Sequence, residues 1–194
     1  MSRKSNSTKR QQIIHEASRL FREKGFKATS MRDIAKQVEI EAASLYSHIK
    51  SKDEILEELV FMIATKFQTG MKSIDESSYR PIQKIKALIA FQIRLVIENP
   101  YAIFLQTQAL MHLKEPHRNK YQTIRDQYAN DFKRIIEEGI AAGEVKKMNP
   151  EIMVFTILSA SRWLYTWYQK DKDINPVELE IQIMELLENG FTAG

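Results

Sequence analysis

The chain has 194 residues, of which 43% are hydrophobic, 9% aromatic and 28% charged, a composition typical of a globular protein and not of a disordered one. It contains no cysteine, which excludes disulfide frameworks, thiolate metal sites and cysteine nucleophiles. No apolar run approaches the roughly 18 residues of a transmembrane helix, and the polar, basic start does not resemble a signal peptide. We therefore expect a cytoplasmic protein with no membrane partner.

Positive charge is concentrated in the N-terminal quarter of the chain. Residues 1–52 hold 12 Lys and Arg against 5 Asp and Glu, whereas residues 53–194 hold 17 against 20. A basic segment on an otherwise slightly acidic chain favours contact with a polyanion, although an ordinary solvated surface can carry the same charge. The residue pattern within this segment distinguishes a polyanion-binding surface from an ordinary solvated one.

The first helix is predicted from apolar residues that recur at helical spacing between Ile13 and Phe21. Gly25 is placed to end this helix near Lys24, because glycine readily adopts the left-handed backbone that closes a helix. The basic residues Lys9 and Arg10 precede the apolar stripe, and we expect them to belong to a flexible arm.

Two short helices are predicted next. Ser30 and Asp33 have the spacing of a capping box, in which a hydroxyl and a carboxylate satisfy free N–H groups at a helix start. The second short helix is predicted from about Ala42 to Ile49, with Ala42, Leu45 and Ile49 on its buried side. Two short helices joined by a tight turn form the pattern of a helix-turn-helix.

The remaining sequence predicts further helices and no strand. A capping-box spacing from Ser51 to Glu54 opens a long helix that links two domains, and three Asn-Pro pairs mark later helix starts. These later helices are expected at roughly 81–98, 100–113, 117–141, 150–170 and 176–189. We predict an all-α protein of about nine helices with a domain boundary between residues 52 and 53.

The second short helix has an outward face typical of a surface that contacts nucleic acid. Its exposed positions carry small or hydrogen-bonding side chains, not the Glu and Lys pairs of a solvated helix. A helix with such a face fits the major groove, where small residues allow close approach and polar ones reach the bases. We expect contacts to bases or sugars from Ala43, Ser44, Tyr46, Ser47 and His48.

Basic and helix-terminal groups flank this face in the sequence. Helix N-termini offer free N–H groups and the positive end of a dipole to a phosphate. We therefore expect contacts to the DNA backbone from Lys9, Arg10, Ser30, Arg32, Lys50 and Lys52.

Ile-Ala at 34–35, Ser-Leu-Tyr at 44–46, His48 and Lys-Ser-Lys at 50–52 all lie in the stretch from Gln12 to Leu59. Together they resemble the N-terminal DNA-binding domain of TetR-family repressors. The resemblance implies a three-helix DNA-binding domain at 1–52, followed by a helical ligand-binding and dimerisation bundle at 53–194. It also implies double-stranded operator DNA and a small-molecule effector as partners.

Two acids depart from the family pattern. Glu39 stands where most members have a turn glycine, and Glu41 stands where the recognition helix usually begins with Ser or Thr. We expect Glu41 to cap that helix through its carboxylate, less ideally than a hydroxyl would. The operator sequence is therefore not inferred from the family.

The predicted helix at 150–170 is apolar in nearly every direction, so one neighbouring core cannot cover it. Together with the last helix it is expected to form a two-fold, four-helix interface, as in TetR-family homodimers. The expected interface residues are Phe155, Leu158, Trp163, Trp167, Ile183 and Leu187.

Aromatic, methionine and leucine side chains along the middle helices are candidates for lining a hydrophobic effector pocket, although the same pattern is typical of an ordinary core. These candidates are Phe61, Phe67, Phe91, Leu95, Phe104, Met111, Tyr121 and Tyr128. The segments 115–118, 138–144 and 163–168 are similar to family members that respond to acyl-CoA thioesters, which implies such an effector. A multidrug-type sensor controlling an efflux pump stays open as an alternative.

No motif favours an enzyme. The chain has no Gly-rich phosphate loop, nucleophile elbow or HExxH motif, and its four histidines are scattered. We expect no catalytic residue, no cofactor and no metal site. A helical protein-interaction module without DNA binding is the remaining alternative.

Overall fold

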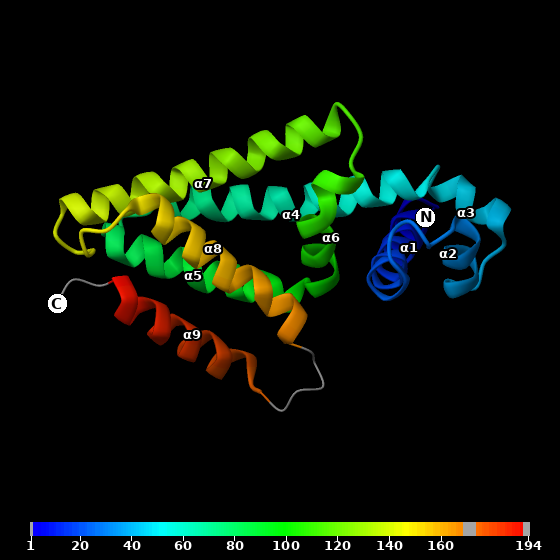
Figure 1. Ribbon diagram of the computed structural model, residues 1–194. Coiled ribbons are helices and arrows are strands. Elements are labelled where there is room, and N and C mark those ends of the chain that lie inside the picture. The colour runs from blue at the N-terminus through cyan, green and yellow to red at the C-terminus, as the bar shows by residue number, and fades with distance from the viewer. Residues whose placement is uncertain (1, 169–173, 192–194) are drawn as a thin grey trace. The chain divides into compact units, whose positions relative to one another are not determined.

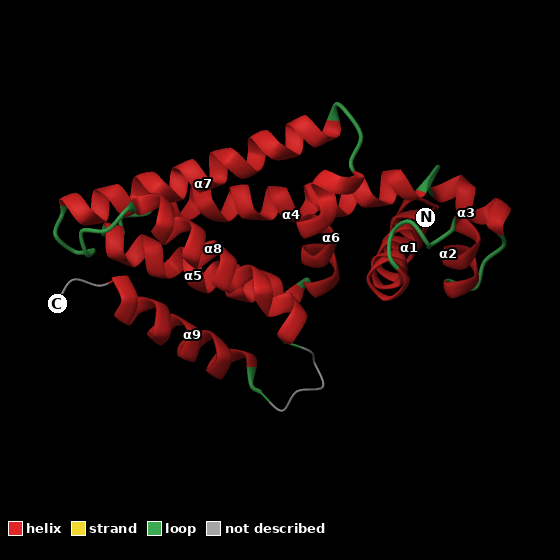
Figure 2. Cartoon of the chain, viewed as in Figure 1, coloured by secondary structure: helices red, strands yellow, loops and turns green. Residues whose placement is uncertain are grey.

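The computed structural model describes residues 2–168 and 174–191, and within them it contains nine helices and no strand (Figures 1 and 2). The helices are α1 (Ser2–Lys24), α2 (Met31–Gln37), α3 (Ala42–His48), α4 (Lys52–Asp75), α5 (Pro81–Glu98), α6 (Pro100–His112), α7 (His117–Ala141), α8 (Pro150–Trp167) and α9 (Pro176–Phe191). The predicted all-α class is confirmed.

Most predicted helix bounds agree closely with the structure. α5 and α7 have the predicted bounds, and α9 continues two residues beyond the predicted end, to Phe191. α8 ends at Trp167, whereas the predicted last residues, 169 and 170, lie outside the described part of the chain. The polar, basic start was expected to be an arm but belongs to α1.

The chain divides into two compact units. Unit 1 comprises the residues up to 63 together with 101–121, and unit 2 comprises 64–100 together with the residues from 122 onward. Unit 1 therefore holds α6 and the first half of α4 in addition to the three N-terminal helices. The predicted boundary between residues 52 and 53 did not include these later helices with the N-terminal ones.

The first three helices of unit 1 pack against one another around a small apolar core. Leu45 and Ile49 are buried as predicted, whereas Ala42 is only half-buried. Other fully buried side chains of this unit include Ile13, Phe21, Ile34, Ile55 and Leu56.

The predicted capping box opens α2. The Ser30 hydroxyl accepts a hydrogen bond from the Asp33 N–H at 3.1 Å, and the Asp33 carboxylate accepts one from the Ser30 N–H at 2.8 Å. These hydrogen bonds, with the Ser30 side chain contributing most, hold the pKa of Asp33 below its ordinary value.

α2 ends in a Schellman motif. The Glu39 N–H donates to the Lys36 carbonyl at 3.2 Å and the Ile40 N–H donates to the Ala35 carbonyl at 3.0 Å. This closure requires a left-handed residue, and Glu39 supplies it with a φ of 53°. Gly25, directly after α1, also has a positive φ, of 89°.

Unit 2 is organised around α5, which packs against α8 and α9. Its fully buried side chains include Ile85, Leu88 and Ile89 of α5 and Phe132 of α7. Asn149 caps α8 as predicted, accepting hydrogen bonds from the N–H groups of Glu151 and Ile152.

Asn99 does not repeat this arrangement. Its side-chain amide donates to the Leu95 carbonyl at the end of α5, and its carbonyl oxygen accepts from Lys66 at 3.1 Å.

Among the described helices, none is long and apolar enough by itself to span a membrane, although α5 and α6 taken together reach that length and apolarity.

Replacing Glu39 by Gly should stabilise the protein by about 0.5–1 kcal/mol, because glycine adopts a positive φ without the steric cost that a Cβ imposes. The free energy of unfolding from urea titration measures this. Gly25→Ala is the matched control and should lose about 1 kcal/mol, since its Cβ would meet no atom within 4 Å and only the backbone conformation opposes it. A loss of stability in Glu39→Gly would contradict this explanation.

Candidate functional site

The exposed face of α3 consists of small and polar side chains. Ala43, Ser44, Tyr46 and Ser47 are exposed, Tyr46 by 53%, and His48 is half-buried. The Ser47 hydroxyl donates to the Ser44 carbonyl at 2.7 Å, which leaves the lone pairs of its oxygen available as acceptors. This face matches the surface predicted to contact bases.

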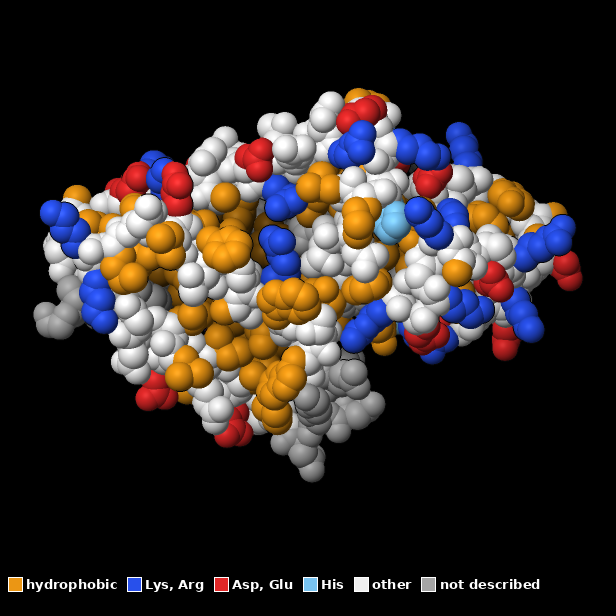
Figure 3. Space-filling view, in the orientation of Figure 1, with side chains coloured by type: hydrophobic (Ala, Val, Ile, Leu, Met, Phe, Trp, Pro, Cys, Tyr) orange, Lys and Arg blue, Asp and Glu red, His pale blue; other side chains and the backbone are white. Residues whose placement is uncertain are grey.

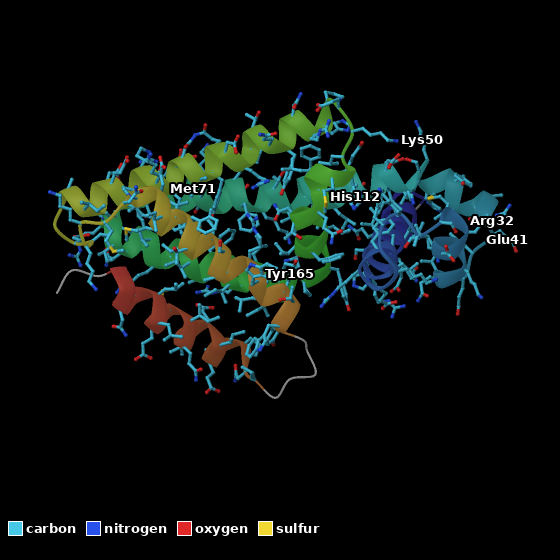
Figure 4. All side chains as sticks on the ribbon, in the orientation of Figure 1. Arg32, Glu41, Lys50, Met71, His112 and Tyr165 are labelled. Atoms are coloured by element: carbon cyan, nitrogen blue, oxygen red, sulfur yellow. The ribbon has the colours of Figure 1, made fainter. Side chains whose placement is uncertain are left out.

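Glu41 occupies the N-cap position of α3 but does not cap it. Its backbone is extended, with φ of −64° and ψ of 143°, and its side chain makes no capping hydrogen bond. The prediction that its carboxylate caps the helix is therefore wrong. Figure 4 shows Glu41 and Arg32 at the same edge of unit 1 in this view.

Ser30 and Arg32 lie at the start of α2 as predicted. The Ser30 side chain is occupied by its capping partner, donating to the Asp33 carboxylate at 2.6 Å while accepting from the Asp33 N–H. Arg32 is exposed in the first helical turn. Of these two side chains, Arg32 remains a candidate for the predicted phosphate contact.

Lys50 and Lys52 are two residues apart but have different surroundings. Lys50 is exposed, and its side chain extends from the segment between α3 and α4 (Figure 4). The Lys52 ammonium donates to the carbonyl oxygens of Phe26, Lys27 and Thr29 at 2.8, 3.1 and 2.9 Å.

These three bonds use all three N–H donors of the Lys52 ammonium, which also lies 4.8 Å above the Phe26 ring. The expected phosphate contact of Lys52 therefore needs correction. In this structure the side chain holds the connection between α1 and α2 together and has no remaining donor for a phosphate.

Lys9 and Arg10 also differ from expectation, because both lie within α1 and not in a flexible arm. Arg10 forms ion pairs with Glu58 and, at 2.9 Å, with Glu54 of α4. Lys9 donates to the Val38 carbonyl at 3.3 Å. Both side chains thus fasten α1 to neighbouring helices of unit 1.

Glu54 connects this ion pair to the segment that follows α3. Its carboxylate accepts a hydrogen bond from the Lys50 N–H at 2.8 Å while it also binds Arg10. The segment that follows α3 is therefore tied to α1 through a single carboxylate. No sequence motif indicated this link, because Arg10 and Glu54 are 44 positions apart.

The structure brings three of the predicted pocket residues together in unit 2. The Phe67 ring lies 6.2 Å from Phe91 and 5.4 Å from Tyr128, both edge to face. Buried beside them is Gln92 of α5, whose side-chain amide donates to the Tyr128 hydroxyl at 3.1 Å. Leu95 is also buried in this unit.

Gln92 was not identified from the sequence as a candidate pocket residue, although its position in the α5 stripe could have indicated it. It continues the buried stripe of α5 that runs through Ile85, Leu88 and Ile89, where a polar residue is unusual. Burial by itself raises the pKa of Tyr128, and the Gln92 hydrogen bond offsets only part of that rise, so the phenol stays protonated.

The other predicted pocket residues, Phe61, Phe104, Met111 and Tyr121, belong to unit 1. Tyr121 is buried, and its hydroxyl donates to the Gln106 carbonyl at 3.0 Å. Met111 is 72% exposed, so its assignment to a buried lining is wrong. It lies two positions after the buried Ala109, which places it on the opposite side of α6.

Large apolar side chains stand exposed on α8 and α9. Phe155 is 72% exposed, Trp163 65% and Trp167 47%, whereas Leu158, Ile183 and Leu187 are half-buried. Figure 3 shows apolar side chains gathered over these two helices. The predicted interface residues thus lie where a partner chain could reach them.

Comparisons with known proteins agree over nearly the whole chain. Residues 78–191 match the family model described as the tetracyclin repressor-like C-terminal domain, and residues 13–59 match that of bacterial regulatory proteins of the tetR family. The HTH-type transcriptional repressor KstR2 of Mycolicibacterium smegmatis is 23% identical over 189 residues, which cover 96% of this chain and 92% of KstR2.

Two solved structures share the fold. The ketosteroid transcriptional regulator KstR2 of Mycobacterium tuberculosis has a TM-score of 0.89 at 20% identity, with 95% of each chain covered. AibR, in complex with isovaleryl coenzyme A and operator DNA, has a TM-score of 0.79 at 19% identity, with 92% of this chain and 97% of AibR covered.

Lys50→Ala should reduce the slope of log affinity against log salt by about 1 per half-site, because an exposed ammonium that contacts a phosphate releases one counterion. Lys52→Met should instead lower the free energy of unfolding by about 1–3 kcal/mol, since three carbonyls lose their donor. Salt-dependent DNA titrations and urea titrations of both variants test the contrast. A weaker salt dependence in Lys52→Met at unchanged stability would support the original prediction that Lys52 contacts a phosphate.

Tyr46→Ala should weaken binding to a selected DNA site on the order of tenfold to a hundredfold, the cost of losing one or two base contacts. Its unfolding free energy should stay within about 0.5 kcal/mol of wild type, since the side chain is largely exposed. Fluorescence anisotropy on labelled DNA measures this, with Tyr79→Ala, an exposed tyrosine of unit 2, as control. Wild-type affinity in Tyr46→Ala would mean that α3 is not the recognition helix.

Proposed function

The chain belongs to the TetR family of bacterial transcriptional repressors, and on that premise we propose that it binds an inverted-repeat operator as a homodimer and is released by an acyl-CoA thioester. The family consists of ligand-responsive DNA-binding regulators, which are not enzymes. The observation that carries the proposal is the outward face of α3, where buried Leu45 and Ile49 direct small and polar residues to the surface.

The homodimer is supported by the apolar surface of α8 and α9. Phe155 and Trp163 expose more than half of their surface, and exposed apolar patches of this kind mark interaction sites. A two-fold partner would cover the patch with an identical one. It would also hold two recognition helices at a fixed separation, ideally about 34–36 Å, which matches successive major grooves.

The acyl-CoA effector is supported by the likeness to AibR and by the aromatic core of unit 2. Phe67, Phe91 and Tyr128 supply apolar surface for an acyl chain. Two basic residues of the segment that resembles acyl-CoA-responsive members already have carboxylate partners. Lys114 pairs with Asp53 at 2.6 Å, and Arg118 pairs with Glu115 at 3.0 Å.

An effector that binds the DNA-free form more tightly necessarily binds the operator complex more weakly, and the two effects are equal in free energy. Adding isovaleryl-CoA or octanoyl-CoA should therefore weaken operator binding by about 5- to 150-fold, and operator should weaken the binding of the acyl-CoA equally. Anisotropy titrations with labelled operator measure the first effect, and calorimetry with and without operator measures the second.

Free coenzyme A is the control and should leave operator binding unchanged. Release by lipophilic cations such as ethidium, with no response to either acyl-CoA, would overturn the effector proposal in favour of a multidrug-type sensor. A folded protein without salt-dependent binding to any DNA would indicate an interaction module.

A further inference from the structure

A polar pair lies buried in the apolar core of unit 2. Gln92 of α5 is 2% exposed and Tyr128 of α7 is 8% exposed, and the Gln92 amide donates to the Tyr128 hydroxyl oxygen at 3.1 Å. Burying an amide and a phenol among aromatic rings is unfavourable unless their hydrogen-bonding groups are satisfied. The hydrogen bond between Gln92 and Tyr128 satisfies one group of each residue, and the question is what the remaining groups of the pair can bind.

Much of the hydrogen-bonding capacity of the pair has no partner within the described residues. The Tyr128 hydroxyl accepts from Gln92 but donates to no described group, and the Gln92 carbonyl oxygen accepts from none. The hydroxyl oxygen is satisfied by Gln92, but its O–H has no acceptor among the described residues and can donate to a bound molecule.

The geometry fixes which group the pair offers. Because the Gln92 N–H occupies a lone pair of the hydroxyl oxygen, the phenolic O–H is directed away from Gln92. Burial raises the pKa of Tyr128, partly offset by Gln92, so the phenol keeps its proton at physiological pH. The pair thus offers an oriented donor, which suits an uncharged acceptor such as a carbonyl oxygen.

Aromatic rings surround this donor. Phe67 and Phe132 lie edge to face with Tyr128, with ring centroids at 5.4 and 6.5 Å. Phe67 and Phe91 are half-buried, whereas the polar pair is buried, so an apolar molecule meets aromatic surface before it meets the donor.

Gly70 of α4 makes room for one of these rings. A Cβ at this position would lie 2.4 Å from two carbons of the Phe91 ring. Apolar walls around a few placed polar groups are the usual composition of a small-molecule site.

We propose that Tyr128, oriented by Gln92, donates a hydrogen bond to the thioester carbonyl of the effector, with the acyl chain packed on Phe67 and Phe91. This inference rests on the proposed acyl-CoA response and deepens it, because it assigns the contact that distinguishes a thioester from other CoA derivatives. Gln92 acts as a positioning residue for the Tyr128 hydroxyl.

The test compares ligands that differ only in the carbonyl. Isovaleryl-CoA and octanoyl-CoA are paired with their thioether analogues, in which a methylene replaces the carbonyl, and calorimetry measures the affinity of each. The wild type should prefer each thioester by about tenfold, the value of one hydrogen bond to a buried donor. Tyr128→Phe should bind each thioester and thioether equally, because the donor is lost while the ring remains.

Tyr79→Phe is the matched control and should keep the wild-type preference, since Tyr79 is an exposed residue of unit 2. Equal binding of thioester and thioether by the wild type, or a preserved preference in Tyr128→Phe, would overturn this inference while the acyl-CoA response stands. Failure of the wild type to bind either acyl-CoA would overturn the proposed effector, and the carbonyl contact with it.

Discussion

The burial of Leu45 and Ile49 is the constraint on which the proposed DNA-reading surface depends. α3 has only seven residues, and isolated helices shorter than about 12 residues are marginal in water. The helix therefore persists because these two side chains pack into unit 1, a burial that contributes about 1.5–3 kcal/mol for each. The same packing directs Tyr46 and its neighbours outward, so folding and presentation of this surface have one cause.

The basic residues of the N-terminal segment divide into two groups that net charge does not distinguish. Lys52 and Arg10 bond to carbonyls and carboxylates of unit 1 and so support the structure. Arg32 and Lys50 are exposed on the same unit as α3. The net charge of the segment therefore does not show which of its described cations can neutralise phosphate, and the salt dependence of binding should reflect the exposed ones.

Local features of the fold were predictable from the sequence, because their causes are local. The capping box at Ser30, the glycine closure at Gly25 and the apolar stripe of α5 each depend on residues within a few positions of one another. The helix bounds and the buried face of α3 followed from such patterns.

Features that depend on distant residues were missed or mistaken. Arg10 meets Glu54 across 44 positions, and the Lys52 ammonium meets carbonyls 23 to 26 positions away, so neither partner is visible in a local pattern. The Glu41 side chain makes no capping hydrogen bond to α3, whereas the shorter Ser, Thr, Asp and Asn side chains are the usual caps. Gln92 became informative only once its partner Tyr128 was located on another helix.

The most direct test of the central claim is to capture fragments of the native genome with the purified protein and to sequence them. A dimer that presents two α3 helices should recover a short inverted repeat, with half-site centres about 10 base pairs or a multiple of that apart. Repetition with acyl-CoA present should deplete that site. Recovery of no enriched site, or of unpaired half-sites alone, would contradict the account of a dimeric, operator-binding repressor.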